Sequence, residues 1–301
     1  MTNDFNIKQA METAVSQAES FDQSDYAAGD LVPIFRPNAT TGRDELVGKI
    51  PRSEFAKAIR GQFERRTRLT DFSLSELRAA VADQDLEKHG LQVGDQKTIN
   101  GRTYVIAGLN TMKGTSSPYR VTVNHVGLIV IPHTTHAWNA SGNTYTGADG
   151  RGAGYKNSDL HYYLKNDILP LVQTDLGSGS LIAHSKMLSS DVNQSGVNRT
   201  GSASGCSSSW AWEDNCYISA LSEVQVYGSV VWSSSGYDTG EACRQLDVFR
   251  KYNMNEIFGS EYPWLRDVVS ASLAANVNDY GHADYSAANL AGYVAGLILF
   301  H

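Results

Sequence analysis

The sequence predicts an α+β protein in which a helical N-terminal region with a small hairpin precedes a mixed domain with long loops. Apolar residues recur at helical spacing near the N-terminus, whereas from residue 91 onward short apolar runs alternate with loops rich in Gly, Ser and Asn. A chain of 301 residues, 41% of them hydrophobic, is also large enough to bury a substantial core. We therefore divide it into residues 1–21, 22–90 and 91–301.

The first segment, residues 1–21, is expected to be a helix that associates with other chains. Ile7, Met11, Ala14 and Ala18 follow one another at the spacing of a coiled-coil seam. Because the seam is short and half of it is alanine, the helix needs sister subunits or a docking surface. A frayed N-terminal tail is the open alternative.

The second segment, residues 22–90, is expected to begin with a hairpin and to continue in two helices. Apolar runs at 31–36 and 45–50 flank a Gly-containing turn, and Pro33 and Pro37 favour an edge strand. The helix-forming signals are an N-cap at Ser53 with an apolar stripe after it, and a Ser73–Glu76 capping box whose helix ends at His89-Gly90.

A locally basic stretch at residues 49–68 offers a docking surface for an acidic neighbour, although a solvated helix face is the simpler interpretation. Few aromatic residues interleave these charges, so stacking on nucleic-acid bases is not expected. The candidate docking residues are Arg52, Lys57, Arg60, Arg65 and Arg66.

In the third segment, short strands and polar loops are expected around one or two helices. Asn100-Gly101 predicts a tight hairpin, and the run at 126–132 predicts a buried strand. Ser158 is placed to cap a helix that Pro170 ends. Residues 177–209 are expected to form long surface loops, 217–231 strand and turn, and 295–300 a final strand.

Charge and cysteine usage exclude several classes of function. A net charge of −7 and a pI near 5.6 argue against a nucleic-acid partner. The sequence has neither the start of a signal peptide nor an apolar run long enough for membrane insertion, so we expect synthesis in a cytoplasm. Cys206, Cys216 and Cys243 form no disulfide framework and are expected to be reduced, with pairing of Cys206 and Cys216 left open.

Two stretches resemble families of phage proteins. Asp30-Leu31-Val32-Pro33-Ile34-Phe35-Arg36, with the following turn, strand and helix start, resembles a particle-proximal segment of phage fibre and appendage proteins over about residues 28–61. A second resemblance, to bacterial and phage domains of C-type-lectin-like fold, rests on the order of several stretches. These are Gly94-Asp95, the 99–107 run, Trp138-Asn139, 154–160, Tyr262-Pro263-Trp264-Leu265-Arg266, 274–281 and the closing 291–299 run. This second resemblance implies a binding scaffold with its termini close together, although Asp267 and Tyr293-Val294-Ala295 depart from the family pattern.

The signals for metal binding and catalysis are weak. His133 and His136, with His125 upstream, lack the glutamate of a zinc protease motif, and no G-x-S-x-G nucleophile turn occurs. Trp212-Glu213-Asp214-Asn215 resembles the calcium-binding strand of true C-type lectins, but the companion loop is absent. We expect no enzyme, no catalytic residues and no cofactor, with calcium as the remaining alternative.

Two clusters have the Tyr, Trp and Asn composition of binding surfaces. We expect them to face a host glycan or protein, and the hypothesis is a head or tail fibre of a virion, assembled as a dimer or trimer with other virion proteins. A capsid decoration protein and an envelope-polysaccharide hydrolase are the alternatives. The candidate binding residues are Trp210, Trp212 and Tyr217 in the first cluster, and Asn276, Asn278, Asp279, Tyr280, His282, Asp284 and Tyr285 in the second.

Overall fold

The computed structural model describes residues 31–37, 44–51, 72–114, 121–147, 153–190, 192–193, 196–197, 210–233 and 245–301, in two units, 1–68 and 69–301. In the first unit β1 (Leu31–Pro37) pairs antiparallel with β2 (Asp44–Pro51), which confirms the predicted hairpin. The helices expected at 1–21 and after Ser53, and the docking candidates Arg52, Lys57, Arg60, Arg65 and Arg66, lie outside the described residues.

The second unit is built on a four-stranded antiparallel sheet in the order β15-β5-β4-β3. Its hairpin turns at Asn100 and Gly101, with φ of 48° and 79°, the positive values that a type I′ turn requires. All residues of β5 are buried, as its apolar run predicts. The strands are β3 (Gln96–Ile99), β4 (Arg102–Leu109), β5 (Val126–Ile131) and β15 (Gly296–Phe300).

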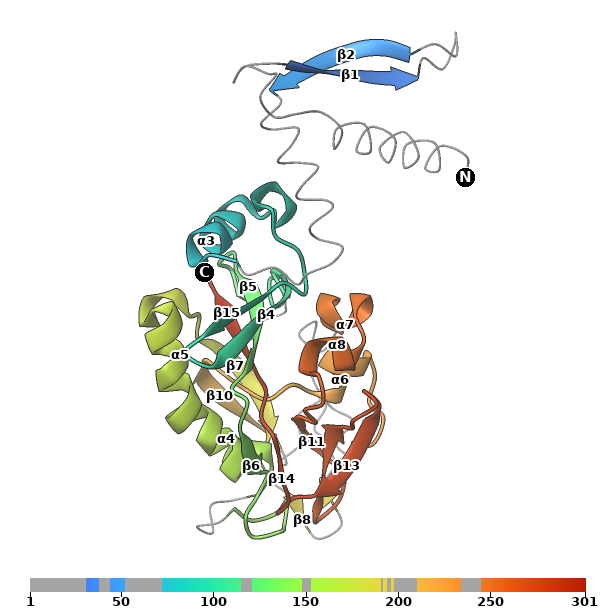
Figure 1. Cartoon of the computed structure of the whole chain (residues 1–301). Helices are drawn as coiled ribbons and strands as arrows, with labels where there is room; N and C mark the ends of the chain where they lie inside the picture. The colour runs from blue at the N-terminus through green and yellow to red at the C-terminus, as the bar shows by residue number, and fades with distance from the viewer. Residues whose placement is uncertain are drawn as a thin grey trace. The chain divides into compact units, whose positions relative to one another are not determined.

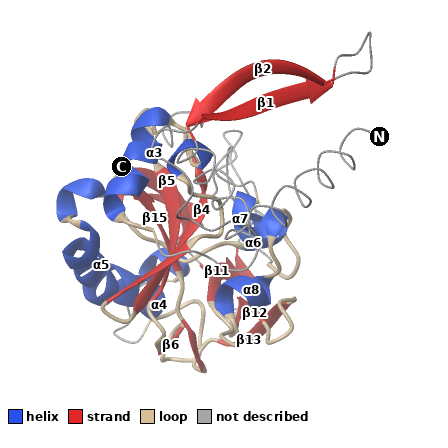
Figure 2. Ribbon diagram, turned by 45° about the horizontal axis from the view of Figure 1, so that its top comes forward, coloured by secondary structure: helices blue, strands red, loops and turns tan. Residues whose placement is uncertain are grey.

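Both faces of this sheet are covered, which makes the unit a mixed α/β domain. Along β4, Tyr104 and Ile106 point into one apolar cluster, whereas Val105 and Ala107 point into another. Figures 1 and 2 show α3, α4 and α5 on one side of β15 and β5, and α6–α8 with a second sheet on the other. The helices are α3 (Leu74–Asp83), α4 (Asp159–Tyr163), α5 (Leu169–Leu176), α6 (Glu223–Tyr227), α7 (Asp247–Lys251) and α8 (Met254–Phe258).

Helix α3 packs within this domain rather than before it. The predicted capping box is present, since the Ser73 hydroxyl accepts from the Glu76 N–H and the Glu76 carboxylate accepts from the Ser73 N–H. The helix ends at Asp83, earlier than expected, and a 3₁₀ turn at Glu87–His89 leads to Gly90. Leu77 and Ala80 of α3 are fully buried in the core, so residues 74–90 pack with the domain that we expected to begin at residue 91.

The helix that Ser158 caps does not end at Pro170. Between α4 and α5 the chain makes a π-helical turn at Leu164–Ile168. Pro170 then occupies the first turn of α5, where its missing N–H is not needed. The helical segment therefore extends to Leu176, and it buries Leu160, Leu164 and Ile168 in the core.

Two further expectations need correction. Residues 177–209, expected to be surface loops, contain the strand β7. Residues 217–231, expected to be strand and turn, contain the helix α6, which begins at a Ser222–Gln225 capping box. Short 3₁₀ turns lie at Tyr155–Asn157 and Ser178–Ser180. The pairs of strands are β6 (Thr135–Ala137) with β14 (Ala291–Tyr293), β7 (His184–Ser189) with β10 (Trp210–Cys216), and β8 (Val192–Asn193) with β9 (Gly196–Val197).

The second sheet of this domain consists of β11 (Trp264–Val268), β12 (Leu273–Val277) and β13 (Ala283–Ala287), with β13 outermost. Cys216 is a buried free thiol at the end of β10, whereas Cys206 and Cys243 lie outside the described residues. Among the described helices, none has the length and apolar character to cross a bilayer.

Candidate binding surface

The hairpin of β12 and β13 presents the second predicted cluster. At its turn, the Asn278 carboxamide oxygen accepts from the N–H groups of Tyr280 and His282, at 3.0 and 2.9 Å. Gly281 has a φ of +80°, which lets the chain reverse there. The turn holds Tyr280 outward, with 72% of its surface exposed.

A second aromatic side chain docks on this hairpin from another part of the sequence. The indole N–H of Trp232 donates to the Ala283 carbonyl at 3.0 Å, and its ring meets Tyr285 edge-on with centroids 4.9 Å apart. Trp232 and Tyr285 remain 46% and 39% exposed, and Val230 and Val231 beside them are exposed as well. We call Val230, Val231, Trp232, Tyr280 and Tyr285 the aromatic surface. Exposed large apolar side chains that lie side by side, as Trp232 and Tyr285 do, often mark an interaction site on a protein surface.

Buried Glu223 fixes the loop that carries Trp232. Its carboxylate accepts from the N–H groups of Val231, Trp232 and Ser233, at 3.0, 2.9 and 2.9 Å. Its own N–H donates to the buried Asp267 carboxylate, whose pKa burial raises to about 6. Hydrogen bonds to a carboxylate are of the strong kind, so Glu223 holds the main chain of residues 231–233 in place.

The other predicted residues of the hairpin divide into exposed and supporting ones. Asp279 and His282 are exposed together with the tyrosines. Asn276 donates through Nδ2 to the Ser286 hydroxyl, and the Asp284 carboxylate accepts from the Tyr285 N–H. Asn276, Asn278 and Asp284 therefore hold the hairpin, at least in part, rather than being free to contact a ligand. Trp232 and Glu223 were not among the residues predicted from the sequence. The one available signal for Trp232 was the apolar run Val230-Val231-Trp232 between Ser and Gly residues.

The first predicted cluster lies on another sheet, at β10. Trp210 and Tyr217 are partly buried and pack against the larger core cluster. The Trp212 carbonyl accepts from the Lys156 ammonium. These rings are anchored in the domain and offer less free surface than the hairpin does.

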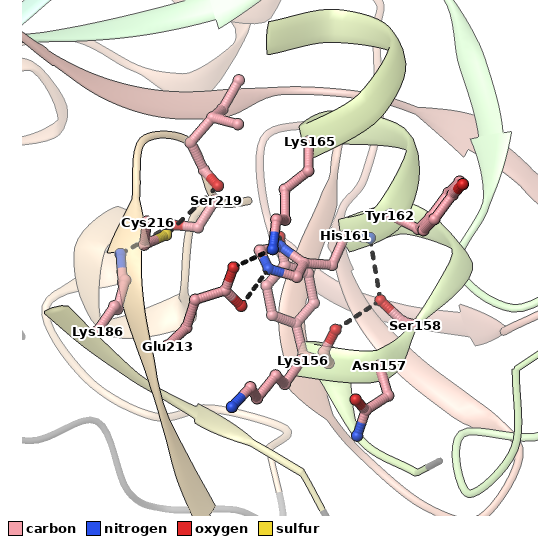
Figure 3. A network of polar contacts seen from close by, with 12 residues as sticks. Lys156, Asn157, Ser158, His161, Tyr162, Lys165, Lys186, Glu213, Cys216 and Ser219 are labelled. Atoms are coloured by element: carbon pink, nitrogen blue, oxygen red, sulfur yellow. Dashed lines mark hydrogen bonds and ion pairs between the residues drawn. The ribbon is translucent and has the colours of Figure 1, made fainter. Parts of the chain in front are cut away.

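A buried polar network ties β10 to α4 (Figure 3). The Glu213 carboxylate accepts from His161 Nε2 at 2.8 Å and from the Lys165 ammonium. Burial lowers the pKa of His161, so its ring is neutral at pH 7 and Lys165 supplies the counter-charge. Burial alone would raise the pKa of Glu213, but His161 and Lys165 together lower it to about 2. The network is satisfied and lies inside the domain, which suits it to holding β10 in place.

The calcium alternative fails on the direction of the side chains. Glu213 points inward to His161, whereas Asp214 is exposed and accepts from the Ser185 hydroxyl at 2.8 Å. Neighbours in a strand alternate faces, so these two carboxylates do not converge on one ion. Within the ranges that the structure describes, no group of three His, Cys, Asp or Glu residues is placed to hold a metal.

The histidine candidates are engaged in hydrogen bonds. His133 Nε2 lies 2.8 Å from the Thr103 hydroxyl and its Nδ1 lies 2.7 Å from Glu261. His136 Nδ1 bonds the Ala137 carbonyl, and its ring stacks on Tyr163.

The order of hydroxyl, imidazole and carboxylate at Thr103, His133 and Glu261 is that of a hydrolase triad. Thr103, however, is buried between β3 and β5, and its hydroxyl also bonds Thr98 at 3.2 Å. A substrate carbonyl cannot reach that oxygen. We therefore assign the three residues a structural role, in which their hydrogen bonds connect β4, the end of β5 and the segment after α8.

Comparison with known proteins gives no relative: no family model matches the chain, and neither a curated protein nor a solved structure matches it.

Proposed function

We propose that this chain is a structural protein of a tailed-phage particle, a head or tail fibre whose 69–301 unit binds the host surface. The observation that supports binding is the aromatic surface. There Trp232 and Tyr285 pack together and stay partly exposed, and the Glu223 carboxylate accepts a hydrogen bond from the Trp232 N–H. Rigid aromatic side chains supply large contact area and lose little conformational entropy on binding. The virion part rests on the resemblance of residues 28–61 to fibre proteins.

We also propose that the 69–301 unit has a C-type-lectin-like fold. In support, the beginning and end of the unit are close: the Arg78 guanidinium of α3 lies 5.4 Å from the Phe300 ring of β15. Such closeness leaves the loops at the opposite side free to vary. Oligomerisation through residues 1–21, as a dimer or trimer, and docking through the basic stretch at 49–68 complete the proposal.

The test uses purified particles and the purified full chain. An antibody against the chain, seen by electron microscopy, should label fibres at the head or the tail. The free chain should compete with particles for adsorption to host cells, and Trp232→Ala with Tyr285→Ala should abolish this competition. A folded double variant that competes as well as the wild type contradicts attachment through this surface. Even labelling over the whole capsid would favour the decoration protein instead.

A further inference from the structure

A fully buried histidine, His125, lies at the base of the connection between β4 and β5. Its N–H donates to the Asn110 carboxamide oxygen at 3.1 Å, and its carbonyl accepts from the Asn110 N–H at 2.7 Å. The ring reaches two more main-chain groups. Nε2 lies 3.0 Å from the Met112 nitrogen, and Nδ1 lies 2.9 Å from the Val123 carbonyl oxygen. One side chain thus ties the two ends of the connection together.

These contacts fix the His125 ring in one neutral form. Nε2 faces the N–H group of Met112 and must accept, whereas Nδ1 faces the carbonyl of Val123 and must carry the proton. A second proton, on Nε2, would turn the acceptor into a donor, so that two N–H groups would face each other. The hydrogen bond to Met112 is buried, and a buried N–H that loses its acceptor costs free energy. The closed arrangement is therefore incompatible with a protonated ring.

The groups around the ring also disfavour its protonation. Burial lowers the pKa of His125; the hydrogen bond to Val123 opposes this in part, and the charges of Lys113 and His301 add to it. His184 of β7 interacts electrostatically with His125 as well, and burial lowers the pKa of His184 to about 3. Lys113, His184 and His301 are all bases. Acid therefore adds like charges around the His125 ring.

The segment that His125 holds covers an outer strand of the main sheet. Met112 and Val121 pack on Leu299 of β15, with the partly buried Ile182 beside them. Met112, Val121 and Leu299 are buried, so this small apolar cluster depends on the connection staying in place. We propose that His125 is an acid-sensitive latch, which holds residues 112–114 against β15 when neutral and releases them when protonated. The latch does not depend on the proposed function.

Hydrogen exchange of the full chain at pH 7.5 and 5.5, followed by mass spectrometry, tests the latch. The lowered pKa favours the closed form above about pH 6.5, the ordinary value for histidine, and this advantage is lost as the pH falls below it. The opening equilibrium should therefore rise by up to about tenfold between the two pH values. We expect residues 110–114 to lose protection by about three- to tenfold, after correction for the intrinsic pH dependence of exchange. The amides of β5 should stay protected, because the release is local.

Two variants separate His125 from the other histidines. His125→Gln offers an acceptor oxygen in place of Nε2 but cannot titrate, so residues 110–114 should exchange alike at both pH values. His133→Gln is the control: it removes a partly exposed histidine beyond the other end of β5 and should keep the pH dependence of the wild type.

The exchange of the wild type decides the matter even where His125→Gln does not fold. Equal protection of residues 110–114 at pH 7.5 and 5.5 overturns the latch. An equal loss of protection throughout β5 overturns it as well, since that indicates global unfolding. A folded His125→Gln variant that keeps the pH dependence assigns the effect to another group and has the same consequence.

Discussion

Replacing Glu223 by glutamine should loosen the loop that presents Trp232. One carboxylate oxygen accepts from the Val231 and Ser233 N–H groups, and the other accepts from the Trp232 N–H. Glutamine keeps one acceptor oxygen, and its amide NH₂ must then face an N–H that it cannot satisfy. The substitution therefore removes at least one charge-assisted hydrogen bond and weakens the remaining ones.

The size of the effect follows from those bonds. A hydrogen bond to a charged group contributes about 1.5–3 kcal/mol, and a buried donor left without a partner costs about 1–3 kcal/mol. Water can reach part of this loop, because Trp232 is half exposed. We therefore expect Glu223→Gln to lower the free energy of unfolding by about 2–4 kcal/mol.

Urea unfolding of the full chain measures this loss. All five tryptophans lie between residues 138 and 264, so their fluorescence reports on the 69–301 unit alone. Glu87→Gln, at an exposed position, is the control and should change stability by less than about 0.5 kcal/mol. The reasoning is refuted if Glu223→Gln unfolds at the same urea concentration as Glu87→Gln, or if limited proteolysis cuts residues 230–233 no faster than in the wild type.

Three further predictions concern the core of the domain. Gly154→Ala should lower the free energy of unfolding by more than about 2 kcal/mol, because φ is +80° and the new Cβ would lie 2.4 Å from the Ser189 carbonyl oxygen. Gly101→Ala is the control: its φ is +79° but its surroundings are open, so the same urea titration should show a loss of only about 1 kcal/mol. The pKa of Glu213 falls on folding from 4.5 to about 2, so its stabilising contribution of about 3 kcal/mol is present above pH 4.5 and is lost as the pH falls toward 2. Glu213→Gln should remove that part of the pH dependence of unfolding, and an unchanged acid transition would contradict the role of the network. Thr103→Val should lower stability by about 1 kcal/mol and leave the background hydrolysis of p-nitrophenyl acetate unaltered, whereas a drop in that rate would favour a hydrolase.

Local signals were enough to predict much of the second unit. The Asn100-Gly101 turn, the Ser73–Glu76 capping box and the fully apolar β5 are each specified by neighbours in the sequence, and all three are present. The prediction that Pro170 ends a helix was wrong because a π turn just before it places the proline where helices tolerate it. Helix α6 was missed although its capping box is local, because its five residues carry too little periodicity to be read.

Of the aromatic surface, only the residues of one hairpin were predicted from the sequence. Tyr280 and Tyr285 stand on a short stretch whose composition indicates exposure, and both are exposed. Trp232 joins them from about 50 residues away through bonds to Ala283 and Tyr285, and Glu223 supports it through main-chain groups. Such contacts depend on tertiary packing, and a single sequence carries no pattern for them. The same limit applied to Glu213. Its sequence neighbours resemble a calcium-binding strand, but its carboxylate is bonded to His161 and Lys165.

The way Glu223 holds its loop has a consequence for how this protein can change. The carboxylate accepts hydrogen bonds from main-chain N–H groups, which every residue except proline possesses. These bonds therefore do not depend on which side chains stand at positions 230–232. Variation there changes the exposed side chains of the aromatic surface while the scaffold beneath keeps its shape. A library randomised at these three positions without proline should yield mostly folded members, so the chemistry exposed here can change by single substitutions.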